Sequence, residues 1–389
     1  MLSEQARPRQ GGTILKVFIF FYFSSVGLFL PYLPLVFRGM GLTSWQIGIL
    51  FSLGPLVTVA VQPLWGYISD RFKTVKRIII GQLTVITSLS LFVFHISSFE
   101  LLLSAIFLFN VFCFPIIPLT DSLTLATASK AGRHYGKFRL WGSLGFALSA
   151  LLFGFFFRSH GLEAFSLCYF ILLFLCLIIS FFLGDASYIG RKANASDIKQ
   201  LLTNRRIIVF LLLTALLSSS NRANDSFMGI FIRQMGGGSE IVGYAWTVAA
   251  LSEVPVMIIC GSLFARFSEL RLLSAAALVF FIRWALFFTV TDPRLVVPIQ
   301  LVHGVSFGLL FLCSVSYITR MVPDRLRSSG QGLLSAFIGG IAGIVGSTLG
   351  GVIMSSLGPR YLYASCAAIA LAAFFFYLHL DRVASRSVK

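Results

Sequence analysis

The sequence predicts an all-α membrane protein whose twelve transmembrane helices form two six-helix bundles. Three observations support this fold class: the chain is strongly apolar, its positive charges favour one side of the predicted membrane, and its second half repeats features of the first. Of the 389 residues, 57% are hydrophobic and 12% are charged, with a mean hydropathy of +0.90. Soluble domains carry about 25% charged residues, so most of this chain is expected to lie in lipid.

Apolar runs of about 20 residues, the length that crosses a bilayer, recur along the whole chain. The first run lacks the small-residue cleavage site of a signal peptide, so we expect it to remain as a span. The predicted spans are 14–37, 44–68, 76–95, 101–127, 138–157, 163–183, 205–232, 241–264, 271–290, 295–319, 328–355 and 360–380.

The positive charges are distributed unevenly between the two sides of these spans. Of the 31 Lys and Arg residues, 24 fall on the side of both termini and five on the other side. This bias follows the positive-inside rule and predicts that both termini are cytoplasmic. The expected location is the plasma membrane, here a bacterial inner membrane. The net charge of +17 is thereby explained by topology, and we expect no nucleic-acid partner.

The two halves of the chain align at an offset of 195 residues. Arg38 then matches Arg233, and Arg71 matches Arg266, each at the same place relative to its span. The longest polar segment, 184–204, falls between the sixth and seventh spans. The sequence therefore predicts an N-terminal bundle at 1–183, a cytoplasmic linker at 184–204 and a C-terminal bundle at 205–389.

Twelve spans in a 6+6 repeat resemble the major facilitator superfamily, which implies a solute site near the bilayer midplane and alternating access. GYISDRFKTVKR also resembles that superfamily's loop between spans two and three. The resemblance implies a conformational latch in which Gly66 permits close helix approach and Asp70 engages a neighbouring helix terminus or basic group. Arg71, Lys76 and Arg77 would hold the loop at the cytoplasmic surface.

Ionisable residues occur inside the predicted spans, where each costs roughly 2.5–3.5 kcal/mol by insertion scales. Such residues line a cavity or pair with one another, so we expect them to gather around one polar chamber shared by the two bundles. They are Asp121, Arg222, Asp225, Glu253, Arg283 and His303, with Arg139 near the start of span five.

Asp121 lies in the apolar run FPIIPLTDSLTLA, and Arg139 follows eighteen residues later within a G-x-x-R-x-x-G pattern. This spacing resembles the oligosaccharide/proton symporter group typified by lactose permease. The resemblance implies that Asp121 and Arg139 contact the substrate and that Phe146, seven residues further on, stacks against it. The alternative is a structural ion pair that joins spans four and five.

Glu253, Arg283 and His303 stand on spans eight, nine and ten, in the order in which that group carries substrate and proton. Burial disfavours the charged form of a carboxyl group, so Glu253 could exchange a proton near neutral pH. Arg283 nearby would favour its deprotonation, and His303 could hydrogen-bond to it. Two departures from the group are Gln300, in place of a lysine, and Ser306, in place of a proton-carrying glutamate.

Span seven adds polar side chains in SSSNRANDSFMG. Asn221 and Asp225 are candidate substrate ligands, and Asn224 is expected to face the same cavity. Arg222 and Asp225 are three residues apart and can equally neutralise each other. RLWGSLGF, LSE, IRW and QLVHGVSFG resemble the phenylpropionate-permease and nucleoside-symporter relatives more than lactose permease.

Four glycines recur every three or four residues in span eleven and predict a small-residue face for close helix packing. They are Gly339, Gly343, Gly346 and Gly350. The six cysteines all fall in predicted spans without metal-ligand spacing, so we interpret them as small apolar residues.

The leading hypothesis is a secondary transporter that acts as a proton-coupled symporter and imports a small polar solute such as an aromatic acid, a sugar or a nucleoside. The expected partners are this solute and the lipid bilayer, the chain is expected to act as a monomer, and no metal or cofactor is expected beyond the proton. The chain is not expected to be an enzyme, because no nucleophile–base pair or metal cluster is visible.

Two alternative functions fit the sequence less well. A drug/proton antiporter usually has a proline-containing motif in span five, and WGSLGFALSALLFG contains no proline. A non-transporting membrane sensor would more typically append a soluble domain, which this sequence does not show. Both alternatives are therefore less favoured than solute import.

Overall fold

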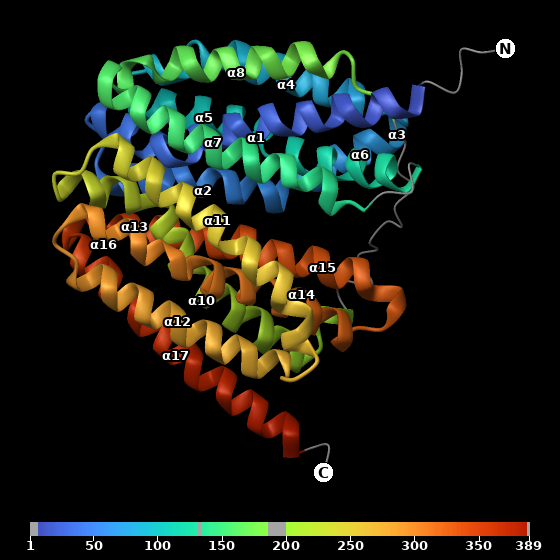
Figure 1. Cartoon of the computed structure of the whole chain (residues 1–389), viewed down its shortest axis with the longest axis vertical. Helices are drawn as coiled ribbons and strands as arrows, with labels where there is room; N and C mark the ends of the chain where they lie inside the picture. Colours follow the sequence, from blue (N-terminus) through green and yellow to red (C-terminus); the bar gives the residue numbers. More distant parts are fainter. Residues whose placement is uncertain (1–6, 131–133, 186–199, 387–389) are drawn as a thin grey trace. The chain divides into compact units, whose positions relative to one another are not determined.

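The computed structural model describes residues 7–130, 134–185 and 200–386. Within these ranges the chain is helical and contains no strand (Figure 1). The longer helices are α1 (Arg7–Gly39), α2 (Ser44–Ala60), α3 (Gln62–Phe72), α4 (Lys76–Ser90), α5 (Phe99–Cys113), α6 (Ile116–Lys130), α7 (Gly136–His160), α8 (Phe165–Ser180), α10 (Arg205–Gln234), α11 (Ser239–Phe264), α12 (Glu269–Thr289), α14 (Leu309–Met321), α15 (Arg327–Ser335), α16 (Ala342–Ser356) and α17 (Pro359–Arg386).

Short helical turns complete these elements. Two of them, η5 (Gly304–Gly308) and η7 (Ala336–Ile341), are π-helical and lie within longer helical runs. The others are η1 (Val93–His95), η2 (Leu162–Ala164), η3 (Pro293–Leu295), α13 (Val296–Ile299), η4 (Gln300–Val302) and η6 (Asp324–Leu326).

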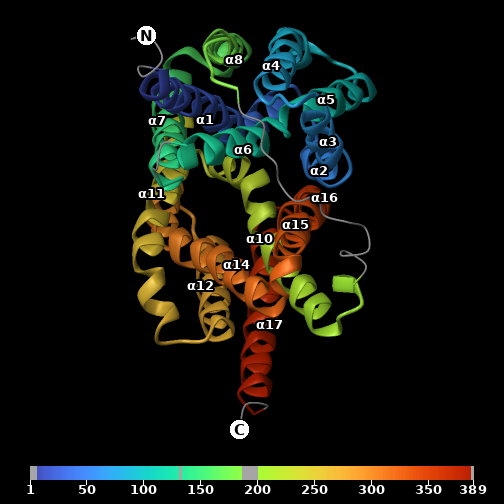
Figure 2. The ribbon, with the colours of Figure 1, turned by 90° about the vertical axis from the view of Figure 1, so that its right-hand side faces the viewer.

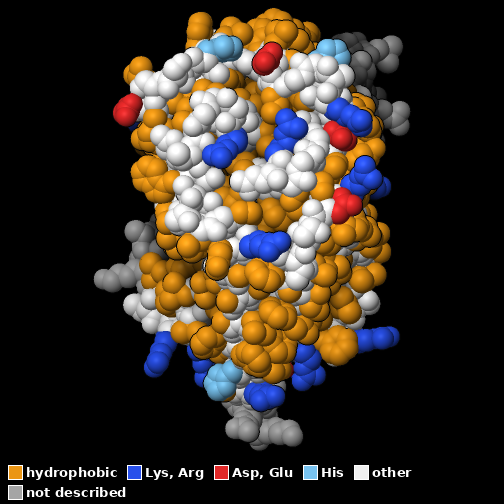
Figure 3. Space-filling view, turned by 90° about the vertical axis from the view of Figure 1, so that its left-hand side faces the viewer, with side chains coloured by type: hydrophobic (Ala, Val, Ile, Leu, Met, Phe, Trp, Pro, Cys, Tyr) orange, Lys and Arg blue, Asp and Glu red, His pale blue; other side chains and the backbone are white. Residues whose placement is uncertain are grey.

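The predicted membrane spans are confirmed. Eleven helical segments of the described chain are long and apolar enough to cross a membrane, and a bent pair, α2 with α3, makes twelve. The 44° bend of that pair lies beside Pro63, which lacks a backbone N–H and fits only the first turn of a helix. In Figure 3, hydrophobic side chains cover much of the face that is shown, which is consistent with a surface in contact with lipid.

The chain divides into two compact units. Unit 1 contains residues 1–42, 56–190 and 238–247, and unit 2 contains residues 43–55, 191–237 and 248–389. The first turns of α2 thus pack with unit 2, and the first turns of α11 pack with unit 1. The bundle boundaries expected from the sequence stay a prediction. Residues 186–199 of the expected linker lie outside the described residues.

In unit 1, α1 and α7 lie side by side (Figure 1), and small residues line the seam between them. A Cβ atom added to Gly27 would overlap the backbone of Phe146, and one added to Gly145 would overlap the Phe20 carbonyl oxygen. The Ser149 hydroxyl donates to the Ser24 backbone oxygen at 2.6 Å. Small residues let backbones approach this closely inside a membrane, and the seam fixes α7, which carries Arg139.

In unit 2, the predicted glycine face packs α16 and η7 against neighbouring helices. A Cβ atom on Gly346 would overlap the Ser219 carbonyl oxygen of α10, and one on Gly343 would overlap the ring of Pro55. Gly350 is in close contact with Ala223. Gly339 does not take part, because open space surrounds its Cβ position.

Two of the predicted latch residues make no close contact in this structure. No atom lies within 4 Å of the Gly66 Cβ position. Asp70 is exposed, and within the described residues its side chain has no hydrogen-bond or ion-pair partner. Their role as a latch stays a prediction.

A different carboxylate, Asp185, caps the N-terminus of α4. Asp185 follows α8, which lies beside α4 (Figure 2), and it accepts hydrogen bonds from the backbone N–H groups of Val75 at 3.0 Å and Lys76 at 3.1 Å. The Thr74 hydroxyl also donates to it. These N–H groups have no partner inside the helix, and negative charge is favourable at a helix N-terminus.

Unit 2 repeats this arrangement at the start of α12. Asp381 near the end of α17 accepts a hydrogen bond from the Ser268 hydroxyl and lies 3.4 Å from Arg271 Nε. In each unit, the start of the third span is therefore held by a carboxylate at the end of the last span or just after it. These spans are α4 in unit 1 and α12 in unit 2. This internal repeat is visible only once the helices are packed.

Replacing Asp185 by alanine is expected to lower the stability of the folded protein by about 0.5–2 kcal/mol, the usual cost of a lost helix cap. The measurement is thermal unfolding of the purified protein in detergent. Asp70→Ala is the matched control, because its exposed side chain is expected to change the melting temperature little. A larger loss in Asp70→Ala than in Asp185→Ala would contradict the assignment.

Candidate functional site

The polar residues of unit 1 form a first cluster, defined by Asp121, Tyr135, Arg139 and Phe23. The Tyr135 hydroxyl donates a hydrogen bond to Asp121 Oδ1 at 2.8 Å. The Arg139 guanidinium lies over the Phe23 ring, 4.0 Å from its centroid. Asp121, Tyr135 and Arg139 are all partly exposed, so the cluster is open to a small polar molecule.

Tyr135 donates to Asp121, so the alternative interpretation, a direct ion pair of Asp121 with Arg139, does not describe this structure. Asp121 and Arg139 form no ion pair with each other within the described residues. Burial and the negative charge of Asp121 raise the pKa of the Tyr135 phenol, whereas Arg139 acts in the opposite direction. Tyr135 therefore stays a neutral hydrogen-bond donor, close to both charged groups.

Phe146 lies two turns beyond Arg139 on α7, and its ring contacts Trp246, with ring centroids 5.9 Å apart and tilted by 58°. Both rings are partly exposed. Flat apolar rings of this kind offer a stacking surface to sugars or aromatic solutes. The sequence motif indicated Phe146 but gave no sign of Trp246, which comes from α11.

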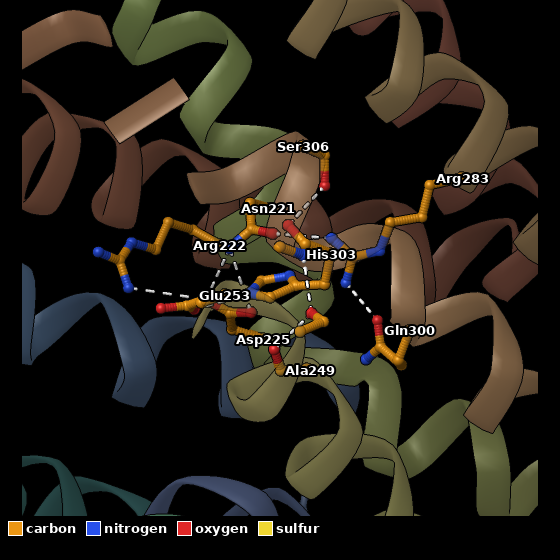
Figure 4. A network of polar contacts seen from close by, with 11 residues as sticks. Asn221, Arg222, Asp225, Ala249, Glu253, Arg283, Gln300, His303 and Ser306 are labelled. Atoms are coloured by element: carbon orange, nitrogen blue, oxygen red, sulfur yellow. Dashed lines mark hydrogen bonds and ion pairs between the residues drawn. The ribbon is translucent and has the colours of Figure 1, made fainter. Parts of the chain in front are cut away.

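The polar residues of unit 2 form a second cluster around Arg283 of α12 (Figure 4). Arg283 is 0% exposed. Its two terminal nitrogens donate to Asn221 Oδ1 at 3.2 Å and to Gln300 Oε1 at 2.5 Å. The guanidinium also lies 4.4 Å from the ring centroid of Trp284. Amide oxygens and an aromatic face therefore hold this buried cation.

Asn221 connects Arg283 to the charged groups of α10. Its amide nitrogen donates to Asp225 Oδ2 at 3.1 Å, and Asp225 forms an ion pair with Arg222 at 3.6 Å. The neutralising pair suggested by the three-residue spacing is thus present. The Asn221 amide oxygen accepts from Arg283 and its amide nitrogen donates to Asp225. Asn221 therefore bridges the two charged side chains by hydrogen bonds, without direct contact between them.

Glu253 and His303 meet on the other side of the cluster. Glu253 Oε1 and His303 Nε2 are 3.2 Å apart, so the expected hydrogen bond is present. The imidazole stacks on Phe307 with ring centroids 5.3 Å apart. His303 Nδ1 is buried without a partner in the described part of the chain. The pair joins α11 to the helical run that carries η5.

Some expected contacts are absent. Arg283 is not bonded to Glu253 in the described structure, because its donors point to Asn221 and Gln300. The Asn224 amide oxygen accepts a hydrogen bond from the Tyr363 hydroxyl at 3.2 Å. The Ser306 hydroxyl donates to the His303 backbone oxygen, so its hydrogen bond stays within its own helix.

Exposure divides the second cluster into an inner and an outer layer. The side chains of Arg222, Asp225 and Glu253 are 37%, 22% and 25% exposed. Arg283, Asn221 and Gln300 are almost fully buried. The outer layer can therefore meet a solute or a proton, whereas the inner layer supports it. No group of three or more His, Cys, Asp or Glu residues within the described ranges could hold a metal ion.

The sequence matches the model of the MFS_1 like family over residues 13–365. The chain belongs to this family. Its matches are transporters of the major facilitator superfamily, and this family member is accordingly a multi-pass membrane transporter and not an enzyme. The resemblance found in the sequence motifs is thereby confirmed.

The relatives of this family member include sugar and aromatic-acid carriers. It is 31% identical to a maltose permease of Geobacillus stearothermophilus, with 92% of each chain covered. It is 26% identical to an Escherichia coli protein named "Probable 3-phenylpropionic acid transporter", over 77% of this chain and 80% of that one. The crystal structure of the nucleoside transporter NupG has the same fold, with a TM-score of 0.85, 17% identity and coverage of 95% and 98%.

Arg283→Lys is expected to destabilise the folded protein. A lysine ammonium cannot donate to both the Asn221 and Gln300 amide oxygens and also stack on Trp284. A buried acceptor left unpaired costs about 1–3 kcal/mol, which thermal unfolding in detergent would detect. Arg222→Lys keeps a cation in the exposed outer layer and serves as the control. An equal melting temperature for Arg283→Lys and the unaltered protein would show that the guanidinium is not required.

Proposed function

We propose that the chain is a proton-coupled symporter that imports a small, neutral, hydroxyl-rich solute, such as a short oligosaccharide, by alternating access. The observation that carries this proposal is the hydrogen-bonded pair of Glu253 and His303. Both side chains can take up and release protons, and Glu253 is exposed enough to exchange one with water. The buried cation Arg283 on α12 belongs to the same cluster and disfavours a second positive charge there.

A proton on Glu253 would alter the cluster in a defined way. The ionised carboxylate accepts a hydrogen bond from the His303 imidazole, whereas the protonated acid can donate one. The change in charge also alters how the outer layer meets a solute. Ser306 and Gln300, which replace the ionisable residues of the lactose-permease group, are engaged with His303 and Arg283. We therefore assign the proton to Glu253, with His303 as its partner.

The charges of both clusters favour a neutral solute over an organic anion. The partly exposed groups include three carboxylates, Asp121, Asp225 and Glu253, which accept hydrogen bonds from hydroxyl groups. Arg283, the strongest candidate for binding an anionic solute, is buried and already hydrogen-bonded within the protein. We propose that Asp121, Arg139 and Phe146 contact the solute from unit 1.

In unit 2, we propose that Asp225 and Glu253 contact the solute directly, and that Asn221 supports them through Asp225. The maltose permease relative supports a sugar, since it matches this chain over 92% of its length at 31% identity. The 3-phenylpropionic acid and nucleoside relatives share less of the sequence. A sugar is therefore the preferred class.

We further propose that both termini are cytoplasmic, because of the 24 to five distribution of Lys and Arg, and that the protein acts as a monomer in a bacterial inner membrane. No nucleic-acid partner and no cofactor other than the proton are proposed. The segment from Gly66 to Arg77 remains the proposed latch. Lys76 supports this role, because its ammonium group donates to the Phe181 backbone oxygen at 2.6 Å.

The solute class is tested with the purified protein in proteoliposomes. Labelled maltose, 3-phenylpropionate and uridine are offered with and without an imposed pH gradient, acid on the outside. We expect concentrative uptake of maltose that requires the gradient, and no such uptake of the other two. Gradient-driven uptake of 3-phenylpropionate without maltose uptake would overturn the neutral-solute proposal and favour an organic acid.

Glu253→Gln is expected to abolish uphill accumulation of maltose while it leaves exchange across the membrane, because an amide cannot carry the proton. Accumulation and exchange are measured in the same proteoliposomes. Glu163→Gln, at an exposed position outside both clusters, is the control and is expected to accumulate maltose normally. If Glu253→Gln still accumulates the sugar under a pH gradient, this residue does not couple transport to protons.

A further inference from the structure

Gly304 and Ser252 form the closest backbone contact next to the proposed proton site. A Cβ atom built on Gly304 would overlap the carbonyl group of Ser252 and would lie 2.8 Å from the Glu253 backbone nitrogen. The Gly304 N–H donates a hydrogen bond to the Ser252 hydroxyl at 2.8 Å. Because the opposing atoms are backbone, they cannot rotate away as a flexible side chain would.

This contact is adjacent to both members of the acid–imidazole pair. Glu253 directly follows Ser252, and His303 directly precedes Gly304. Gly304 also begins the π-helical turn η5, where the helix widens and its register changes, as often occurs at functional positions. The distance between the two backbones therefore sets how far the Glu253 and His303 side chains must reach to meet at 3.2 Å.

We propose that Gly304 is a positioning residue for proton coupling: its missing side chain holds α11 against η5 at the separation at which Glu253 and His303 form their hydrogen bond. This inference rests on the proposed role of Glu253. Gly304 itself contacts neither the solute nor the proton. It acts through backbone contact, and the Ser252 hydroxyl fixes the register of that contact.

Ordinary helix packing does not account equally well for this position. Gly308 lies one turn further along η5 and faces the same helix, yet its Cβ position meets only the Val256 side chain, at 3.2 Å. An alanine there needs a shift of a few tenths of an ångström, which a side chain can provide. At Gly304 the backbones themselves would have to separate. The two glycines therefore make a matched pair on one helix surface.

The charged groups around Glu253 come from three other elements. His303 approaches it from the start of η5, Asp225 and Arg222 come from α10, and Arg283 comes from α12 (Figure 4). The three atoms nearest to the Gly304 Cβ position all belong to Ser252 and Glu253 of α11. A side chain at Gly304 therefore acts first on the separation of η5 and α11.

The test is an infrared titration of the full-length protein in lipid, without solute. The carboxylic-acid band lost in Glu253→Gln is assigned to Glu253. In Gly304→Ala we expect this band to change position, because the hydrogen bond between Glu253 and His303 is altered. Gly308→Ala is expected to leave the band where it is.

Transport provides a second readout. With maltose as the probe, Gly304→Ala is expected to lose most of its uphill accumulation but to retain exchange. In a Glu253→Gln background the same substitution is expected to have no further effect on exchange, because the pair it positions is already broken. If Gly304→Ala cannot be recovered folded, Ser252→Ala decides, since it removes the hydroxyl that accepts the Gly304 N–H and fixes the register of η5 against α11.

An unchanged Glu253 band in Gly304→Ala, or in Ser252→Ala where the first variant does not fold, overturns the inference. An equal shift in Gly308→Ala also overturns it, because general packing would then explain the effect. A shifted band together with accumulation that survives Glu253→Gln has a different meaning. In that case Gly304 still positions the pair, and it is the proposed coupling role of Glu253 that fails.

Discussion

The constraint on which the second cluster depends is that a cation in the membrane interior must find all its partners within the protein. Arg283 is fully buried on an apolar helix, and the hydrocarbon of the bilayer contains no hydrogen-bond acceptor for its guanidinium. Asn221 and Gln300 accept hydrogen bonds from its two terminal nitrogens and Trp284 lies against its face, while Nε has no partner among the described residues. Once Asn221 is held by Arg283, its amide nitrogen points to Asp225, so the position of this outer carboxylate is coupled to the buried cation.

Much of this could be predicted from the sequence, because length, hydropathy and the cost of buried charge act locally. The spans and the Arg222–Asp225 pair follow from such patterns, whereas the Glu253–His303 hydrogen bond follows from the resemblance to the lactose-permease group. The neutral partners do not. Gln300 was treated as a departure from a family pattern, although it is a main acceptor for Arg283. An amide has no titratable charge, so composition and spacing give no sign of its importance.

Contacts between distant segments were also out of reach of sequence reasoning. Asp185 falls in a polar stretch that looks like a linker, yet it caps α4 more than 100 residues earlier in the chain. Glycine spacing predicted one face of span eleven correctly at Gly343 and Gly346 but not at Gly339. Whether a glycine is in contact depends on where two helices cross, and that point is fixed by packing of the whole unit.

The separation of roles within the second cluster follows from exposure. A group that carries a proton must reach water in at least one state, so it cannot be sealed, whereas a fixed charge that biases it acts most strongly where water is excluded. Glu253 is partly exposed, and Arg283 is not. Gln300 holds Arg283, and the backbone contact at Gly304 holds Ser252 next to Glu253, both without adding charge. A proton on Glu253, as proposed, would leave these contacts in place, because neither the Gln300 amide nor the Gly304 backbone titrates.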